Sequence, residues 1–395
     1  MNSQINSASP PIRRGDIGRG AARASEWKHR EALLLASYAM FGRDSTGRRY
    51  DEEPHPYRGP FQRDRDRILH SAAFRRLSGK MQVFTGDMGD YHRTRLTHTH
   101  EVATIARTIG RVLRLNEDLI EALALLHDIG HPPYGHSGED ALRECLRDHG
   151  GFSHNRFALT LVEELETRYT PYPGLNLSQE VLAGQGFRID HGGAAPLLEV
   201  QVVDLADSLA YNAHDVDDAL ALGLIRFQQL QGLELVQRAL DWGQTSLHAQ
   251  PQAIRQSLVH SLIDVQVADV LDRSLDALQE LAGLDSLSVR QLETKLALSP
   301  PLASEREQLA QFLFDNVYRH DKLITVRQSA ATRVRRLFER LVANANMLPP
   351  RFVDRAQRVG VPLAVGAYLA GMTDRYCDQQ YRQLIELGAT SAADW

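Results

Sequence analysis

Apolar residues recur along this chain at spacings of three and four, which is the period of an α-helix. The clearest run consists of Val102, Ile105, Ala106, Ile109 and Leu113. A second run covers 119–126 after Asn116, a candidate N-cap, and Gly130 follows at the place of a helix C-cap. A third run begins at Leu198 and ends near Leu222. These segments predict three helices with one apolar face each.

Helical patterns continue through the second half of the chain, and alternating strand patterns are scarce. They cover roughly 255–283, 304–318, 322–344 and 362–388. We therefore expect an all-α fold with one short hairpin at 82–93, where a turn-prone Gly-Asp pair occurs twice. Loops are expected at 42–60, 131–138 and 169–196. The last of them is long for a compact domain and is typical of a lid or a binding element.

Composition adds limits on partners and compartment. The 395 residues suffice for one large core or two domains, and a net charge of -5 gives no overall bias toward nucleic acid. Two cysteines cannot form a disulfide framework, and no run of about eighteen apolar residues occurs, so we expect a cytoplasmic protein without a membrane segment. The Arg-rich residues 1–26 lack an apolar stretch and predict a flexible basic tail, with an organelle presequence as the alternative.

The stretch 127–139 is the most informative part of the sequence. Its residues include three glycines, two prolines and five chemically active side chains, namely His127, Asp128, His131, His136 and Glu139. Proline removes a backbone donor and glycine weakens a helix, so the stretch predicts a helix end, a rigid turn and a new helix start. At such a break, an adjacent His-Asp pair can turn both side chains toward one point, as a metal site requires.

Two further helices supply the remaining candidate ligands. His98 opens a helix 29 residues before His127, and Asp207 lies on a third helix, where it shares one face with Tyr211 and Asp215. The candidate metal ligands are His98, His127, Asp128 and Asp207. Two imidazoles and two carboxylates suit a divalent ion with positions open for water and phosphate oxygens. The alternative is a helix-end charge pair at 127–128 and a solvated polar stripe on the third helix.

Nine sequence blocks between roughly residues 58 and 380 carry a family likeness. They are 63–70, 73–77, 80–83, 91–98, 127–139, 151–155, 206–215, 317–320 and 370–375. In these blocks the chain resembles the HD-domain superfamily of metal-dependent phosphohydrolases and, within it, the dGTPase-like deoxynucleoside triphosphate triphosphohydrolases. Departures from the family pattern occur at Met81, Tyr134, Phe157 and Ala367. None of the four is a candidate metal ligand. Met81 and Phe157 could alter the nucleotide pocket, so the base of the preferred dNTP stays open.

The resemblance implies a fold, an activity and a cofactor. The fold is an HD-domain helical core at 95–222, preceded by a helical, phosphate-binding segment at 27–94 and followed by a C-terminal helical region at 223–395. The activity is hydrolysis of dNTPs to a deoxynucleoside and inorganic triphosphate with a divalent ion, either Mn²⁺ or Mg²⁺ or another transition metal. A homo-oligomer is also implied, and a dNTP activator and single-stranded DNA are further candidate partners.

The resemblance also assigns catalytic roles around the metal. His136 and Glu139, spaced by three, would form a proton-transfer dyad that acts on the attacking water or on the leaving 5′ oxygen. His131 and His154 would face the phosphates as cations or donors. For each histidine, the alternative is a helix cap or a buried, hydrogen-bonded side chain.

Four residues are implied in substrate binding. Arg95 would reach the α-phosphate or the sugar, and Gln82 would contact the base. Tyr211 would stack on the deoxyribose and exclude a 2′-hydroxyl, and Asp215 would bind the 3′-hydroxyl. Ordinary core packing is the alternative for Tyr211.

A basic segment before the first candidate ligand could bind triphosphate or an allosteric nucleotide. Its members are Arg63, Arg67, Arg75, Arg76 and Lys80. For Arg63 and Arg67, the alternative is a solvated amphipathic face on which Asp64 and Asp66 are their partners.

Two other functions stay open at this point. One is another HD phosphohydrolase, acting on a nucleoside monophosphate or a phosphodiester. The other is a dNTP-sensing or single-stranded-DNA-binding module with little catalysis. The basic segment, Tyr211 and Asp215 favour a triphosphate and a deoxyribose, and the intact ligand set favours an active enzyme.

Overall fold

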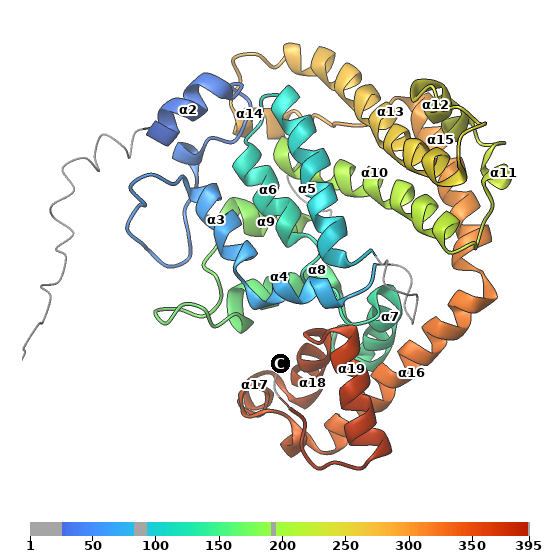
Figure 1. The fold of residues 1–395 in the computed structure, drawn as a ribbon. Helices are drawn as coiled ribbons and strands as arrows, with labels where there is room; N and C mark the ends of the chain where they lie inside the picture. The colour runs from blue at the N-terminus through green and yellow to red at the C-terminus, as the bar shows by residue number, and fades with distance from the viewer. Residues whose placement is uncertain (1–25, 83–92, 191–194, 394–395) are drawn as a thin grey trace, which may run out of the picture.

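The computed structural model describes residues 26–82, 93–190 and 195–393, and these residues form an all-α fold (Figure 1). Among them, helices follow one another without a β-strand, and two isolated bridges join Arg48 to Ser178 and Met81 to Thr94. The all-α prediction is therefore confirmed. The hairpin predicted at 82–93 and the tail predicted at 1–26 lie, apart from their end residues, outside the described residues.

Helices occupy most of both halves of the chain. Those of the first half are α2 (Glu26–Leu34), α3 (Pro60–Leu69), α4 (Ala72–Arg76), α5 (Arg95–Val112), α6 (Glu117–Leu126), α7 (Gly135–Cys145), α8 (His154–Thr160), α9 (Gln179–Phe187) and α10 (Leu198–Ala221). Those of the second half are α11 (Phe227–Leu230), α12 (Glu234–Trp242), α13 (Pro251–Gln279), α14 (Ser286–Gln291), α15 (Pro300–Leu313), α16 (Asp321–Ala343), α17 (Pro350–Val359), α18 (Val361–Ala370) and α19 (Asp374–Tyr381). In the part of the chain that the structure describes, no helix combines the length and the apolar character needed to cross a membrane.

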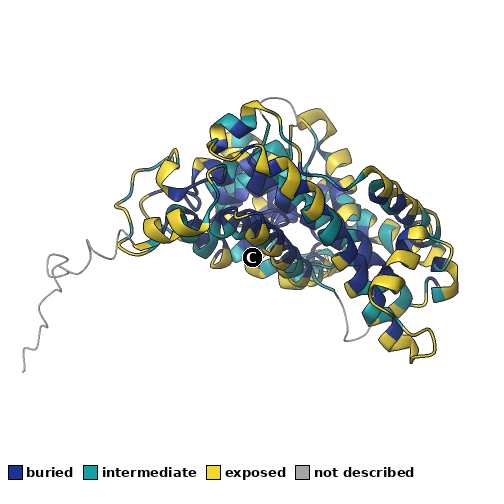
Figure 2. Ribbon diagram, turned by 90° about the horizontal axis from the view of Figure 1, so that it is seen from above, coloured by how far each residue is buried: buried dark blue, intermediate teal, exposed yellow. Residues whose placement is uncertain are grey.

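The centre of the molecule is formed by α5, α6 and α10, which pack against one another, and α3 packs on α6 (Figure 1). The apolar face predicted for α5 is buried, with Val102, Ala106 and Ile109 fully enclosed. In Figure 2 the buried positions line the inner faces of the helices and the exposed positions line the outer faces. Removing these apolar faces from water stabilises the packing of the three helices that carry the candidate metal ligands.

Side-chain caps define where two of these helices begin. The hydroxyl oxygen of Thr94 accepts a hydrogen bond from the backbone N–H of Thr97 (3.3 Å) at the start of α5. The side-chain oxygen of Asn116 accepts one from the N–H of Leu119 (3.3 Å) at the start of α6, as its predicted role as N-cap requires. The first cap places His98 in the first turn of α5.

Gly130 has a different role from the predicted C-cap. The helix α6 ends at Leu126, and His127 caps it in a right-handed backbone conformation. Gly130 instead lies against the backbone of α8, where a Cβ atom would be 2.0 Å from the carbonyl oxygen of His154 and 2.6 Å from the nitrogen of Ala158. Only a residue without a side chain permits this close approach.

The prediction of a continuous loop at 169–196 is wrong for its middle part, where the chain forms α9. Glycines at 184 and 186 weaken the helical signal in the sequence. In the structure, Gly184 faces α6 and α10, where a Cβ would lie 2.5 Å from Cδ2 of Leu123 and 2.9 Å from Cγ2 of Val200. Close packing therefore stabilises a helix that local propensity disfavours.

Other boundaries also differ from the prediction. The helix predicted at 362–388 is divided into α18 and α19, and Thr373 begins α19 by accepting a hydrogen bond from the N–H of Tyr376 (3.2 Å). The helix α7 begins at Gly135, inside the loop predicted at 131–138. None of the helical runs expected from periodicity covers α12 or α17, although both lie in the C-terminal helical region expected at 223–395.

The C-terminal helices lie beside α7. The long helix α16 packs along α7 and also contacts α18 and α19 (Figure 1). This arrangement brings the start of α19 next to the turn that precedes α7, so that residues far apart in the sequence can meet there.

Candidate metal centre and adjoining histidine cluster

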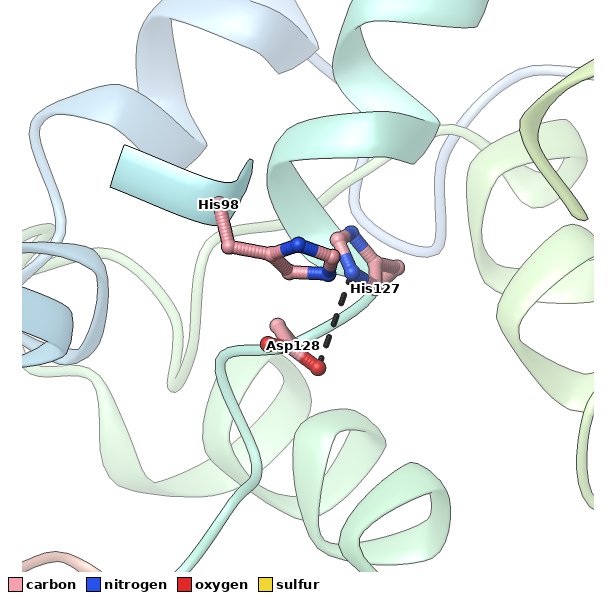
Figure 3. A group of neighbouring side chains, drawn as sticks. All are labelled: His98, His127 and Asp128. Carbon is pink, nitrogen blue, oxygen red and sulfur yellow. Dashed lines mark ion pairs between the residues drawn. The ribbon is translucent and has the colours of Figure 1, made fainter. Parts of the chain in front are cut away.

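Three helices bring the four candidate metal ligands together. His98 lies in the first turn of α5, His127 caps α6, Asp128 follows it, and Asp207 lies within α10. Figure 3 shows the rings of His98 and His127 close to each other and to the carboxylate of Asp128. The Nε2 atom of His98 is 3.1 Å from Oδ1 of Asp207. The Nε2 atom of His127 is 3.6 Å from Oδ1 of Asp128 and 3.7 Å from Oδ1 of Asp207. His98, His127 and Asp128 thus form one group that could hold a cation, and Asp207 borders this group through its contacts with the two histidines.

The backbone fixes which nitrogen of His127 is available to a metal. Its Nδ1 donates to the carbonyl oxygen of Ala124 (2.6 Å), so the neutral ring presents a bare Nε2. This Nε2 is buried and has no hydrogen-bond partner among residues 26–82, 93–190 and 195–393. Burial lowers the pKa of His127, which favours the neutral ring. A buried acceptor without a donor, beside two carboxylates, fits a divalent cation.

Asp128 is held by two donors. Its Oδ2 accepts a hydrogen bond from Nη1 of Arg95 (2.9 Å), and its Oδ1 lies 2.9 Å from Nδ1 of His131. Burial alone would raise the pKa of Asp128, but His131 and Arg95 outweigh it and keep this pKa well below its usual range. Arg95, predicted to contact substrate, is almost fully buried, and its guanidinium also donates to the carbonyl oxygen of Gln82 (3.3 Å). In this structure it orients a candidate ligand.

The remaining histidines gather around Glu139, and we call His131, His136, Glu139 and His154 the histidine cluster. The predicted His136–Glu139 pair is loose, with 3.5 Å between Nδ1 and Oε2, and the His136 side chain is 57% exposed. Glu139 binds His154 more closely, accepting from its backbone N–H (3.0 Å) and lying 3.0 Å from its Nδ1. The rings of His131 and His154 stack with centroids 3.8 Å apart. Glu139 therefore has two histidine partners, and the distances favour His154.

The charge of Glu139 is stabilised by the same neighbours. Burial would raise the pKa of this carboxyl, but the hydrogen bonds from His136 and His154 outweigh it and hold the pKa below its usual range. Glu139 is therefore a carboxylate at neutral pH and can only accept hydrogen bonds.

Asp374, at the start of α19, holds the turn that leads into α7. Tyr134 in this turn has a left-handed backbone, with φ 62°. The Asp374 carboxylate accepts hydrogen bonds from the N–H groups of Tyr134 (2.8 Å) and Met81 (3.0 Å). Nearby, the buried Nζ of Lys80 donates to the carbonyl oxygen of His131 (2.5 Å). The sequence marks Asp374 only as part of the 370–375 block, and no local pattern indicates that it reaches 240 residues back along the chain.

A third group of side chains comprises Tyr211, Asp215 and Tyr318. Asp215 follows Tyr211 by one turn of α10 and is buried, and the hydroxyl of Tyr318 donates a hydrogen bond to it. The ring centroids of Tyr211 and Tyr318 are 6.5 Å apart. Burial raises the pKa of Asp215 to about 7. Tyr318 belongs to the 317–320 block, but the sequence alone assigns it no role. The side-chain oxygen of Gln82 is buried and has no hydrogen-bond partner within the described ranges.

Comparison with known proteins identifies the family. Residues 95–212 match the HD domain, and residues 296–383 match the phosphohydrolase-associated domain. A deoxyguanosinetriphosphate triphosphohydrolase-like protein of Bordetella pertussis is 41% identical over 373 residues, which cover 90% of this chain and 97% of the relative. Proteins of the same name from Geobacter metallireducens and Thiobacillus denitrificans are 39% and 40% identical, over 91% and 89% of this chain and 97% of each relative.

The chain belongs to the deoxyguanosinetriphosphate triphosphohydrolase-like family of HD-domain proteins. The predicted family resemblance is thereby confirmed. Membership makes the chain an HD-family hydrolase, and HD domains bind divalent metals. The donor set around the bare Nε2 of His127 agrees with that property.

In this triphosphohydrolase-like chain two members of the basic segment, Arg63 and Arg67, are held in ion pairs. Arg63 and Arg67 both bind Glu52, at 2.6 and 2.5 Å. Asp64 is completely buried and pairs with Arg48. The alternative of a solvated face is therefore wrong for Arg67 and Asp64. These charges connect the loop before α3 to the helix, which stabilises the fold around the site.

Proposed function

We propose that this chain is a metal-dependent dNTP triphosphohydrolase that converts a dNTP and water into a deoxynucleoside and inorganic triphosphate. Water adds to the α-phosphorus, the bond from that phosphorus to the 5′ oxygen breaks, and the 5′ oxygen takes up a proton. The name shared by the relatives supports the substrate class. The structural observation that carries the proposal is the bare, buried Nε2 of His127 among three other ligand side chains.

In this proposal, His98, His127, Asp128 and Asp207 hold the divalent ion, either Mn²⁺ or Mg²⁺. When bound, such an ion polarises a phosphate and lowers the pKa of a coordinated water. Arg95 already holds Asp128 through Oδ2, so its guanidinium fixes the orientation of one ligand. We propose that Arg95 also contacts the α-phosphate or the sugar.

The histidine cluster would handle protons and phosphate. Glu139 stays ionised at neutral pH, so it can hold the Nδ1–H of His154 and leave Nε2 of that ring to exchange a proton with the attacking water or the 5′ oxygen. His136 is a second candidate for this role, because its Nδ1 also approaches Glu139. The Nε2 of His131 is buried without a hydrogen-bond partner in the described structure. Because Nδ1 of this ring donates to Asp128, a contact of Nε2 with a phosphate oxygen would require the doubly protonated, cationic ring.

The sugar and the base would be recognised away from the metal. Asp215 would bind the 3′-hydroxyl, which would then replace the hydroxyl of Tyr318 as its hydrogen-bond partner. Tyr211, one turn away, would stack on the deoxyribose and leave no room for a 2′-hydroxyl. Gln82 would contact the base through the side-chain oxygen that lacks a partner among the described residues.

Product analysis tests the proposed reaction. The purified chain is incubated with each of the four dNTPs and Mn²⁺ or Mg²⁺, and we expect equal amounts of deoxynucleoside and triphosphate. Asp207→Asn should abolish both Mn²⁺ binding and turnover, whereas Asp276→Asn, on the exposed face of α13, should change neither. Release of orthophosphate or pyrophosphate would refute the proposal in favour of another HD phosphohydrolase. Binding of a dNTP without hydrolysis would favour a sensing module.

The proposed partners beyond the substrate come from the family resemblance. They are a dNTP activator, single-stranded DNA and further copies of the chain. Assays with pairs of dNTPs would reveal activation, because one nucleotide would raise the hydrolysis rate of another. Light scattering with and without dNTP would measure the number of copies, and a labelled oligonucleotide would test binding of single-stranded DNA.

A further inference from the structure

His214 lies directly behind the candidate ligand His98. It belongs to α10, is 2% exposed, and its ring meets that of His98 at 82° with centroids 5.3 Å apart. The two Nδ1 atoms are 3.1 Å apart, which is hydrogen-bond distance. On its other side, Nε2 of His214 is 2.8 Å from Oε2 of Glu101, a residue of α5. His98, His214 and Glu101 thus form a chain of hydrogen bonds that leads away from the metal site.

The ligand role proposed for His98, together with Glu101, sets the position of each proton in this chain. A carboxylate can only accept, so Nε2 of His214 carries the proton of the bond to Glu101. A neutral His214 ring then has a bare Nδ1, which can accept a hydrogen bond from Nδ1 of His98. In this tautomer the Nε2 atom of His98 is bare and can bind the ion. In the other tautomer Nε2 carries the proton and donates it to Oδ1 of Asp207 (3.1 Å), so it is not available to a metal.

Glu101 is well suited to anchor the chain. Burial would raise its pKa, but the hydrogen bond from His214 and the charge of Arg93 outweigh it and lower the pKa of Glu101 to about 2. Arg93 pairs with Glu101 and, through Nη2, with Asp217 of α10 (2.9 Å). Glu101 is therefore ionised at neutral pH, and Arg93 joins it to α10, the helix that carries His214.

We propose that Glu101 and His214 are positioning residues of the metal centre, which orient His98 and keep its Nε2 free for the ion. The inference rests on the proposed metal-dependent function. Neither residue touches the ion or the substrate, so each acts only through His98. Loss of such an outer hydrogen bond lowers metal affinity by about 10- to 100-fold.

Mn²⁺ titration of the full-length chain tests this proposal without any turnover. His214→Phe keeps a ring of similar size but removes the acceptor, and we expect Mn²⁺ to bind about 10- to 100-fold more weakly. His214→Asn places an amide oxygen near the position of Nδ1 and should recover most of the affinity, whereas His214→Gln, whose amide reaches further, should not. His100→Phe is the matched control, because His100 is exposed on α5 and packs against Phe74.

Two outcomes would overturn the proposal: wild-type affinity in His214→Phe, or equal affinities in the Asn and Gln variants. If the Phe variant does not fold, the comparison of Asn with Gln decides alone. Nitrogen NMR of the histidines adds a second readout. We expect protons on Nδ1 of His98 and on Nε2 of His214. The opposite tautomer of His98 would refute the proposed chain of hydrogen bonds. Wild-type protein that binds Mn²⁺ but releases no triphosphate would instead refute the proposed function, without affecting the positioning role of Glu101 and His214.

Discussion

Replacing Gly130 by alanine tests whether the contact between the metal-binding turn and α8 sets the position of His154. A Cβ at this residue would lie 2.0 Å from the carbonyl oxygen of His154, 2.6 Å from the nitrogen of Ala158 and 3.0 Å from its Cα. Ordinary van der Waals contacts of a Cβ begin at 3.4 Å. The contact with the carbonyl oxygen of His154, at 2.0 Å, is therefore far too short for the two atoms to keep their positions. All three atoms belong to the backbone and cannot rotate away. The alanine variant must therefore push α8 outward.

Two effects of different size should follow. Overpacking of this kind lowers the free energy of unfolding by about 1–3 kcal/mol. His154 moves with α8, and its Nδ1 is only 3.0 Å from Glu139, so the displacement breaks that contact. Misplacement of a catalytic group by about 1 Å can reduce the rate about 100-fold. We therefore expect a moderate loss of stability and a much larger loss of dNTP turnover.

The loss of stability is measured by urea unfolding, monitored by circular dichroism. The loss of turnover is measured by the rate of triphosphate release. Gly186→Ala is the matched control, because a Cβ at Gly186 in α9 has no atom within 4 Å. There alanine should raise the stability by up to about 1 kcal/mol through helix propensity, without a change in turnover. A Gly130→Ala variant that unfolds at the same urea concentration as the wild type and hydrolyses dNTPs at the same rate would refute this reasoning.

Three further predictions concern the turn held by Asp374, the histidine cluster and the buried carboxyl of Asp215. Asp374→Ala leaves two backbone N–H groups without their acceptor, so urea unfolding should show a loss of about 1–3 kcal/mol, and an unchanged midpoint would contradict this. His154→Ala should lower kcat by about 100-fold or more with normal Mn²⁺ binding, and His136→Ala should lower it less. The reverse order would favour His136 as the residue that transfers the proton together with Glu139. The pKa of Asp215 is raised by burial to about 7, so its contribution to stability is present at low pH and is lost as pH rises through 7. Relative to the wild type, Asp215→Asn should gain roughly 2–3 kcal/mol between pH 5 and pH 8, and a constant difference in urea midpoint would disprove the shift.

The sequence could identify the candidate ligands because their signals are local. His127 and Asp128 are adjacent at a helix break, and His98 and Asp207 lie on helices with clear apolar periodicity. Packing of the apolar faces then decides which polar positions face inward. The structure brings the four side chains together for this reason, since α5, α6 and α10 bury their apolar faces against one another.

The second partner of Glu139, His154, could not be predicted in the same way. A spacing of three on one helix makes His136 the expected neighbour, whereas His154 lies 15 residues further along the chain. Its approach depends on the contact between Gly130 and α8, which is a tertiary feature. The helix α9 could not be predicted for a similar reason. In the sequence Gly184 disfavours a helix, whereas in the fold its lack of a side chain permits close packing against Leu123 and Val200.

The C-terminal region supplies parts of the site that its position in the sequence conceals. The residues matched by the phosphohydrolase-associated domain include Tyr318, which binds Asp215, and Asp374, which holds the turn before α7. The same region provides the carbonyl oxygen of Ala370, which accepts a hydrogen bond from Lys80 (3.0 Å). Each contact joins this region to a residue at or beside the candidate site. The region matched by the HD domain alone therefore lacks the groups that fix the start of α7, so the histidine cluster depends on the C-terminal helices for its geometry.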